Sequence, residues 1–285
     1  MNEMAPRGIA AAPQVVTRPP AGIGGRPWYS SRSMEHVVAV LAPIALLLIW
    51  EATVRVGLLD ARFFPAPSFI VSTFYYLTFD VPWARSLPYH VLISLSRVTI
   101  GFIIGAIPAI ILGTVMGLVP LVRAAVQPIV GALFPIPKVA IMPLIMLIVG
   151  LGEESKWTII AIGVFFQVLI ATATGVANID KIYFDVGRNF LAGRTDTFRR
   201  IALPGAMPTI FAGLRLGWGM ALLLLVTAEM ISADNGIGNL IWRAWMTLAV
   251  EDMYVGLVTI AFIGIVSFWL FDLFESLLLP WKSRR

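Results

Sequence analysis

The sequence predicts an all-α membrane protein with about six transmembrane helices. Hydrophobic residues make up 59% of the 285 residues and charged residues only 13%, whereas a soluble domain carries roughly 25% charged residues. Six apolar segments are each long enough to cross about 30 Å of hydrocarbon as a helix. They are, approximately, residues 37–56, 91–119, 122–149, 157–177, 208–232 and 253–279. The alternating hydrophobicity of a membrane β-barrel is absent from this pattern.

Two regions are expected along the chain. Residues 1–35 are rich in Pro, Gly, Ala and Arg and lack apolar periodicity, which predicts a disordered tail. They also lack the apolar run of about 7 to 15 residues that a cleavable signal peptide needs. Residues 36–285 are expected to form one transmembrane domain.

The distribution of basic residues predicts the orientation. With the N-terminus inside, the inner segments hold thirteen Lys and Arg residues, and the outer segments hold four, Arg62, Arg85, Lys156 and Arg243. Cytoplasmic loops collect such charges, so both termini are expected in the cytoplasm. The same asymmetry accounts for the pI of about 9.8 without nucleic acid as a partner.

Few residues could carry chemistry. The chain has no cysteine and only two histidines, which stand in different segments, so no metal site and no cofactor are predicted. No paired carboxylates, histidine cluster or serine elbow points to an enzyme. The phosphate-binding pattern GxxxxGK[ST] is also absent, which excludes that type of ATP site.

Small residues recur at helical spacing in two segments. Every fourth residue is small in the ridge Gly101, Gly105, Ala109, Gly113 and Gly117, and Gly213 and Gly217 repeat the pattern. Such ridges let another membrane helix approach closely. Packing within the fold and a subunit interface are both open interpretations.

The third apolar segment contains three prolines, Pro135, Pro137 and Pro143, with Lys138 among them. Proline removes a backbone donor and clashes with the preceding turn, so a regular helix cannot continue through this stretch. Broken backbone at membrane depth is tolerated where it is buried in protein or lines a water-filled cavity. We hypothesise a position beside a translocation pathway. The alternative is a kinked packing helix whose break lies near the membrane surface.

Two charged residues stand within the fifth apolar segment. Glu229 and Arg215 each oppose insertion by roughly 2.5–3.5 kcal/mol at the centre of a span. They are 14 residues apart, or about 21 Å along a helix, so they cannot pair with each other. Pairing with other helices, snorkelling, and contact with a solute or gate are the alternatives, and Glu229 is a candidate for the pathway.

A hydrophilic stretch, residues 178–208, separates the fourth and fifth segments. Its apolar residues recur at spacings of three to five, which predicts an amphipathic helix outside the bilayer: Ile182, Tyr183, Val186, Phe190 and Leu191. After Gly193 a second helical piece should run to Leu203 and be stopped by Pro204.

This stretch resembles the cytoplasmic loop of the permeases of binding-protein-dependent ABC importers, of the nitrate, sulfonate, taurine and bicarbonate type. The match is clear in TFRRIALPGAMPTIFAGLRLGWG, which includes Leu203, Pro204 and Gly205. The family's Glu-Ala-Ala positions fall on Asp185, Val186 and Gly187, and its glycine position falls on Leu191, with Gly193 two residues later. These departures predict a shifted or altered bend between the two helices.

Three further segments carry the resemblance, in the order of the family, so that it covers roughly residues 85–282. They are HVLISLSRVTIGFIIGAIPAIILGTVMG, FPIPKVAIMPLIMLIVGLGEESK and AEMISADNGIGNLIW.

The resemblance implies that residues 36–285 are the permease domain of an ABC importer in the cell inner membrane. Expected partners are cytoplasmic ATPase subunits docked on the loop residues, an extracytoplasmic solute-binding protein, and a second permease copy within the lipid bilayer. ATP hydrolysis would belong to the partner. The expected solute is a small anion such as nitrate, a sulfonate, taurine or bicarbonate, and aromatic acids and neutral heterocycles stay open. The alternative function is a secondary transporter driven by an ion gradient, although no internal repeat supports it.

Overall fold

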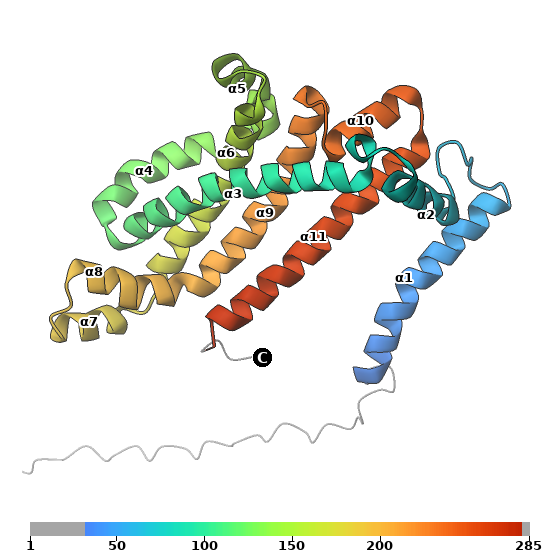
Figure 1. Cartoon of the computed structure of the whole chain (residues 1–285). Helices are drawn as coiled ribbons and strands as arrows, with labels where there is room; N and C mark the ends of the chain where they lie inside the picture. The colour runs from blue at the N-terminus through green and yellow to red at the C-terminus, as the bar shows by residue number, and fades with distance from the viewer. Residues whose placement is uncertain (1–31, 281–285) are drawn as a thin grey trace, which may run out of the picture. The chain divides into compact units, whose positions relative to one another are not determined.

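The computed structural model describes residues 32–280, which are helices joined by turns and loops, without a strand in that range. Of the tail expected over residues 1–35, residues 1–31 lie outside the described part of the chain, whereas residues 32–35 already belong to α1. The helices are α1 (Arg32–Arg55), α2 (Pro67–Tyr75), α3 (Leu87–Leu118), α4 (Pro120–Leu133), α5 (Met142–Val149), α6 (Glu153–Ala177), α7 (Lys181–Asn189), α8 (Arg194–Asp196), α9 (Leu203–Ser232), α10 (Ile237–Thr247) and α11 (Val250–Leu278). They are labelled in Figure 1. The prediction of an all-α membrane protein is confirmed.

The chain divides into two units, residues 1–52 and 53–285. The first contains most of α1, whose stretch Val37–Arg55 is long and apolar enough to cross a membrane. Its large apolar side chains are exposed from Val37 to Ile49, as expected of a helix that faces lipid. All the other helices belong to the second unit.

Helices α3, α6 and α9 form the core of the second unit. Gly101 of α3 lies against Ile160 of α6, and Gly113 lies against Thr172, so the two helices run parallel. The buried residues between the three helices are aliphatic for the most part, and include Val98, Val164, Val168, Leu169, Leu224 and Leu225.

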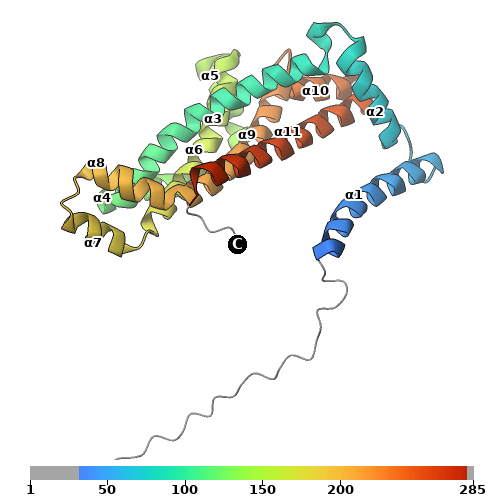
Figure 2. The same ribbon diagram turned by 60° about the horizontal axis from the view of Figure 1, so that its bottom comes forward.

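Helix α9 packs against α6 in the opposite direction and also contacts α3. Gly175 of α6 lies against Thr209, whereas Gly163 lies against Met220 and Leu224. The beginning of α3, the beginning of α6 and the end of α9 therefore meet at one end of the unit, which we call the polar-network end. The other end, where α6 passes through α7 and α8 into α9, we call the α7–α8 end. Figures 1 and 2 both show α7 and α8 at one end and α10 at the other.

The parallel arrangement of α3 and α6 explains the role of the third apolar segment. Because both helices begin at the same end, the chain between them must return to that end before α6 begins. Helix α4 and the segment Lys138–Val149, which contains α5, are bent by 85° relative to each other and together are apolar enough to cross a membrane. With this pair counted as one span, the structure has six candidate spans.

Two short helices escape the sequence prediction, which searched for long apolar runs. Helix α2 packs against α11, and α10 packs against α11 and α9. Helix α10 carries Trp242 and Trp245, whose ring centroids are 4.8 Å apart. Tryptophan is enriched at membrane–water interfaces, which suits a short helix at the polar-network end.

The prediction that Pro204 stops the second helical piece is wrong. A wide π-type turn, Thr197–Ala202, leads directly into α9, and Pro204 lies in the first turn of that helix. At this position the N–H that proline lacks would have no partner within the helix. The fifth apolar segment thus begins at Leu203 rather than at Pro208, which α9 contains in its interior.

Candidate functional site

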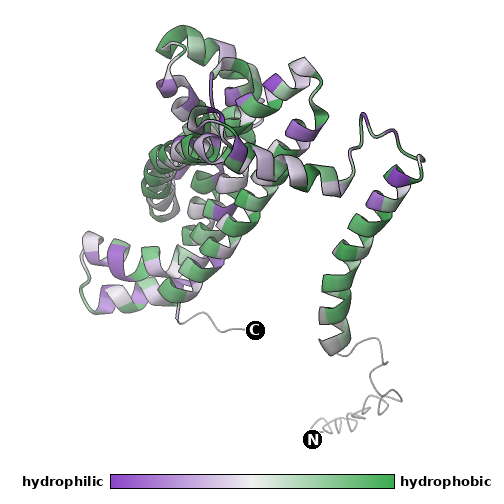
Figure 3. Cartoon of the chain, turned by 45° about the vertical axis from the view of Figure 1, so that its right-hand side comes forward, coloured by the Kyte–Doolittle hydropathy of each residue, from purple (hydrophilic) through white to green (hydrophobic). Residues whose placement is uncertain are grey.

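The α7–α8 end carries an exposed amphipathic helix. Asp180 caps α7 by accepting a hydrogen bond from the N–H of Ile182 at 3.0 Å. The apolar residues predicted to share one face of this helix are exposed rather than covered by the rest of the described chain: Ile182, Tyr183, Val186, Phe190 and Leu191. In Figure 3 hydrophilic turns gather at this end, whereas the long helices are mostly hydrophobic. Helix α7 therefore offers an uncovered apolar face at the end of the bundle.

The bend after α7 is formed by Leu191 itself. Its φ of 54° lies in the left-handed region, and the N–H of Ala192 donates to the carbonyl of Gly187 at 2.9 Å, as in the usual helix ending. A leucine there costs about 1–2 kcal/mol relative to glycine. The bend thus stays at the family's glycine position instead of moving to Gly193, which does not have a positive φ.

The remaining loop residues tie α7 to the core. Gly187 is buried, and a Cβ atom there would lie 2.6 Å from Cδ1 of Ile201. Gly205 is exposed, but a Cβ would lie 2.9 Å from Cδ1 of Ile179. Asp185 is exposed and bonds to Arg188 within α7 at 3.3 Å, while Leu203 and Pro204 are half-buried in the first turn of α9. The α7–α8 end is therefore joined to the core by close packing at Gly187 and Gly205 and, from α8 onward, by helical backbone that leads into α9.

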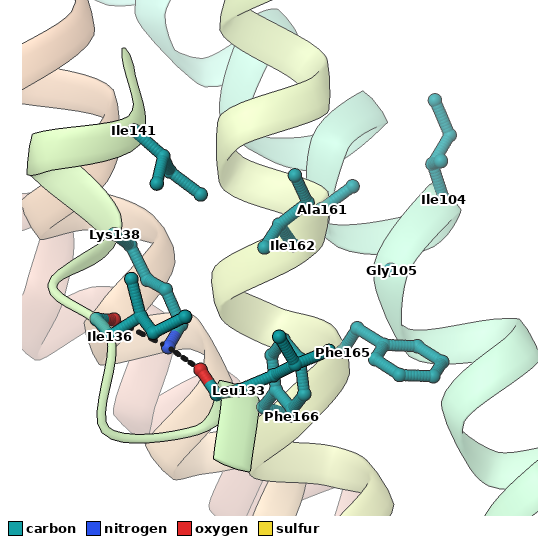
Figure 4. A pocket seen from close by; sticks show the side chains of 10 residues that line it. All are labelled: Ile104, Gly105, Leu133, Ile136, Lys138, Ile141, Ala161, Ile162, Phe165 and Phe166. Carbon is teal, nitrogen blue, oxygen red and sulfur yellow. Dashed lines mark hydrogen bonds between the residues drawn. The ribbon is translucent and has the colours of Figure 1, made fainter. Parts of the chain in front are cut away.

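The proline-rich break lies between α4 and α5. Its backbone changes direction over residues 134–137, after which a 3₁₀ turn, Lys138–Ile141, leads into α5 with Pro143 in its first turn. Lys138 points back to the end of α4 (Figure 4), where its Nζ donates to the carbonyls of Leu133 at 3.2 Å, Phe134 at 2.6 Å and Ile136 at 2.8 Å. It thereby satisfies carbonyls that the break leaves without helical partners.

A cavity of about 510 Å³ lies between this break, α3 and α6. Its walls are apolar apart from Lys138, and include Ile104 of α3 and Ile162, Phe165 and Phe166 of α6 (Figure 4). A second cavity of about 270 Å³ shares Ile136 and Lys138 and is closed by α9. Pro137 lines this second cavity, whereas Pro135 and Pro143 line neither.

Glu229 lies elsewhere, in a buried ionic cluster at the polar-network end. Its side chain is 0% exposed, and its Oε1 accepts from Nη1 of Arg97, itself 3% exposed, at 2.9 Å. Both oxygens lie within 2.9 Å of the hydroxyl of Ser94. The structure thus pairs Glu229 with α3, and it pairs Arg215 separately with Asp272 and Glu275 of α11.

Arg97 uses all five N–H donors of its guanidinium. Nε and Nη2 each donate to Glu153 of α6 at 2.6 Å, Nη1 donates to Glu229 and to the carbonyl of Asn235, and Nη2 also donates to Oδ1 of Asn235. Because every donor has an acceptor, this buried cation joins α3, α6 and α9 to the loop after α9.

The same cluster fixes the backbone of that loop. The N–H groups of Gly236, Ile237 and Gly238 donate to His90, Ser94 and Glu229, respectively, each at 2.8–2.9 Å. Gly236 has φ 104° and ψ 166°, a conformation almost restricted to glycine. The cluster therefore holds this turn in place. The carboxylate of Glu229 already accepts hydrogen bonds from Arg97, Ser94 and Gly238.

Sequence reasoning missed Arg97 and Glu153 as members of this cluster. The available signal was the cost of charge at membrane depth, which requires a partner for Glu229 and for Arg97. Periodicity assigns a face within one helix but does not say which helices meet, so the partner could not be chosen from the sequence.

Comparison with known proteins identifies the family. Residues 101–283 match the model of the binding-protein-dependent transport system inner membrane component. The chain is 31% identical to the putative aliphatic sulfonates transport permease protein SsuC of Bacillus subtilis (strain 168), with 86% of this chain and 87% of the relative covered. It is 30% identical to the taurine transport system permease protein TauC of Escherichia coli (strain K12), with 90% and 93% covered. It is 28% identical to the nitrate import permease protein NrtB of Synechococcus elongatus, with 89% and 95% covered.

These matches confirm the resemblance inferred from the loop and from the three other segments, and they set aside the secondary transporter. The chain belongs to the inner membrane components of binding-protein-dependent transport systems and is the permease subunit of an ABC importer, in which a separate subunit hydrolyses ATP.

Proposed function

We propose that this permease imports a small solute with an anionic group, of the sulfonate, taurine or nitrate type, and that ATPase subunits drive it through α7 and the turn after it. The observation that carries the proposal is the uncovered apolar face of α7 at one end of the α3–α6–α9 core. Contact of an apolar face with water is unfavourable in free energy, so we expect a groove of a partner protein to cover this face.

The connection of α7 to the spans supports a role in force transmission. Helix α7 follows α6 after a short turn, and the π-type turn Thr197–Ala202 continues into α9 without a break. A partner that moves α7 would therefore move both helices. Asp185, Val186, Gly187, Leu191 and Gly193 would form the gripped part, and Leu203, Pro204 and Gly205 the junction with α9.

We further propose that the α7–α8 end and both termini are cytoplasmic, and that the polar-network end is extracytoplasmic. The excess of Lys and Arg on the segments assigned to the inside supports this orientation. The solute-binding protein would then deliver its cargo at the end where the buried side chains of Arg97 and Glu229 hold the loop after α9 in place.

The translocation pathway would pass the break between α4 and α5, which contains Pro135 and Pro137 and is followed by Pro143. Non-helical backbone at membrane depth requires protein or a water-filled cavity around it, and two cavities flank this break. A second copy of the permease would complete the pathway. Glu229 is better suited to fixing the extracytoplasmic loop, because its carboxylate is fully buried and hydrogen-bonded.

Reconstitution tests the proposed solute class. The permease, its ATPase and its solute-binding protein are placed in liposomes, and uptake of nitrate, taurine, ethanesulfonate and bicarbonate is measured with and without ATP. We expect ATP-dependent uptake of at least one of these solutes, and none by the permease alone. Uptake of a solute without an anionic group in place of all four would refute this solute class.

The absence of cysteine from the sequence allows a direct test of orientation. Single cysteines are introduced by Phe190→Cys at the α7–α8 end and by Trp245→Cys at the polar-network end, both exposed side chains. In intact cells, a membrane-impermeant maleimide should label the cysteine at 245 and spare the cysteine at 190. The reverse pattern would overturn the proposed mechanism.

A further inference from the structure

Lys138 is the charged residue of the break, and no carboxylate in the described part of the chain pairs with it. Its Nζ contacts three carbonyls, of Leu133, Phe134 and Ile136, and lies 5.6 Å and 4.9 Å from the ring centroids of Phe134 and Phe166. Within residues 32–280 it forms no ion pair with a carboxylate. Carbonyl dipoles and aromatic faces stabilise the ammonium, but they leave its formal charge in place.

The basic residues within the core helices α3, α6 and α9 are neutralised, whereas Arg123 of α4, like Lys138, donates to backbone carbonyls. Arg97 pairs with Glu153 and Glu229, Lys156 pairs with Glu153, and Arg215 pairs with Asp272 and Glu275. A span that retains an uncompensated cation bears a cost of roughly 2.5–3.5 kcal/mol at the membrane centre on translocon scales. A neutral amide could donate to the same carbonyls without that cost. The charge at position 138 therefore calls for a reason besides capping.

The surroundings of Lys138 amplify its charge. The cavity of about 510 Å³ is lined by ten residues, of which Lys138 alone is charged, and its walls from α3 and α6 are aliphatic and aromatic. In such a low-dielectric environment, the attraction between a cation and an anion is several times stronger than in water. No carboxylate lines this cavity or the smaller one behind it, so an anion would meet no repulsive group there.

We propose that Lys138 is a specificity-determining residue, supplying the positive charge that an anionic solute meets as it passes the break between α4 and α5. This inference rests on the proposed function, since it assigns the solute's charge to one side chain. A lysine has three N–H donors, and all three are engaged by carbonyls in this structure. Lys138 would thus act as a point charge that selects for negative charge and tolerates different anion shapes.

A role as a helix cap alone is the competing explanation, and the chain offers a matched control for it. Arg123, in the first turn of α4, donates from Nε to the carbonyl of Met116 at 3.0 Å and from Nη2 to that of Gly117 at 2.9 Å. It caps the end of α3 in the way that Lys138 caps the end of α4, but it lines a different cavity, of about 390 Å³ between α4 and α6, and neither of the two cavities at the break.

The experiment compares chemically matched side chains in the assembled importer. Lys138→Arg keeps donors and charge, and Lys138→Gln keeps donors without charge. Lys138→Cys, the sole cysteine of the permease, is alkylated either with bromoethylamine, which produces a lysine-like ammonium, or with iodoacetamide, which produces a neutral amide of the same length. Wild-type complex treated with each reagent shows any effect on the partner subunits. The readout is ATP-dependent uptake of nitrate and ethanesulfonate, with co-purification of the ATPase as a measure of assembly.

We expect uptake to fall by about tenfold or more in Lys138→Gln, equivalent to ~1.4 kcal/mol in the barrier, and to remain within about twofold of wild type in Lys138→Arg and Arg123→Gln. Aminoethylated Lys138→Cys should recover uptake, and the carboxamidomethylated form should not. The inference is overturned if the neutral amide restores uptake as well as the ammonium does, or if Arg123→Gln loses as much as Lys138→Gln. If the wild-type complex takes up no anion, it is the proposed function that fails.

Discussion

Arg97 and Glu229, 132 residues apart in the sequence, form a buried ion pair with 2.9 Å between Nη1 and Oε1. The pair links the first half of α3 to the end of α9 at the polar-network end. With Glu153 of α6 as a second carboxylate partner of Arg97, the three core helices share one cation. These helices are therefore expected to move as a rigid group at this end, and bending during transport should occur elsewhere.

Removal of Arg97 should destabilise the protein strongly. Arg97→Met leaves Glu229 buried without its cation, and breaking a buried pair in this way costs about 3–5 kcal/mol. Thermal unfolding in detergent, followed by tryptophan fluorescence, should show a clear drop in midpoint. The double variant Arg97→Met/Glu229→Met should recover part of the loss, since it leaves no unpaired buried charge.

The exposed pair of Asp60 and Arg62 provides the control. Their side chains bond at 2.7 Å but lie largely in solvent, and exposed pairs contribute at most about 1 kcal/mol. Asp60→Asn should thus leave the midpoint almost unchanged. A midpoint for Arg97→Met as high as that of Asp60→Asn would contradict a structural role for the buried cluster.

Gly105 should not tolerate even one added methyl group. A Cβ atom there would lie 2.9 Å from Cα of Ala161, and the backbone of α6 cannot move away as a flexible side chain can. We expect Gly105→Ala to separate α3 from α6 and to lower the unfolding midpoint. Overpacking of this kind costs about 1–3 kcal/mol.

Gly131 of α4 is the matched position for this test, because a Cβ atom there would meet nothing within 4 Å. Gly131→Ala should raise the midpoint slightly, since alanine is the better helix former by about 1 kcal/mol. Equal responses of the two variants would show that close contact between α3 and α6 does not limit stability.

The sequence predicted most of the fold because the bilayer imposes simple rules on it. Long apolar runs marked the spans, and the proline run 135–143 marked the break. The pattern of Ile182, Tyr183 and Val186 marked α7. Each of these signals is local, since it depends on length or periodicity within one segment.

The parts that escaped prediction depend on contacts between segments. Arg97 could pair with Glu229 only after α3 and α9 had been placed against α6, and no periodicity reports that placement. The prediction for Pro204 was wrong because proline can either stop a helix or stand in its first turn. The wide turn before it leads into α9, so Pro204 stands in the first turn of that helix. The bend at Leu191 could not be predicted from the residue type, because leucine rarely adopts the left-handed φ that it has here.

Replacement of Leu191 by glycine should stabilise the α7–α8 end. The left-handed conformation costs a leucine about 1–2 kcal/mol relative to glycine, and its side chain, 92% exposed, packs against little of the described chain. Hydrogen exchange of the α7 amides should slow in Leu191→Gly. Gly193→Ala, at a position with open space and no positive φ, should change exchange little. Faster exchange in Leu191→Gly would mean that the leucine side chain itself holds the turn.

A charge on the exposed face of α7 should separate the permease from its ATPase without unfolding it. Val186→Asp places a carboxylate on the apolar face, and an unpaired charge buried in a partner groove costs several kcal/mol. Because Val186 is exposed in this chain, the unfolding midpoint should stay near that of wild type. Co-purification of the ATPase and solute-stimulated ATP hydrolysis should both fall by about tenfold or more, which corresponds to ~1.4 kcal/mol.

Asp185→Asn, in the same gripped segment, tests whether docking depends on the apolar face or on the acidic side chain of α7. Its carboxylate is exposed and bonds within the helix to Arg188, so its loss should weaken α7 by only about 0.5 kcal/mol. If the apolar face is the docking surface, Val186→Asp should release the ATPase far more than Asp185→Asn does. If Val186→Asp retains the ATPase and transport stays intact, the docking surface does not include the apolar face of α7, and that face has another role.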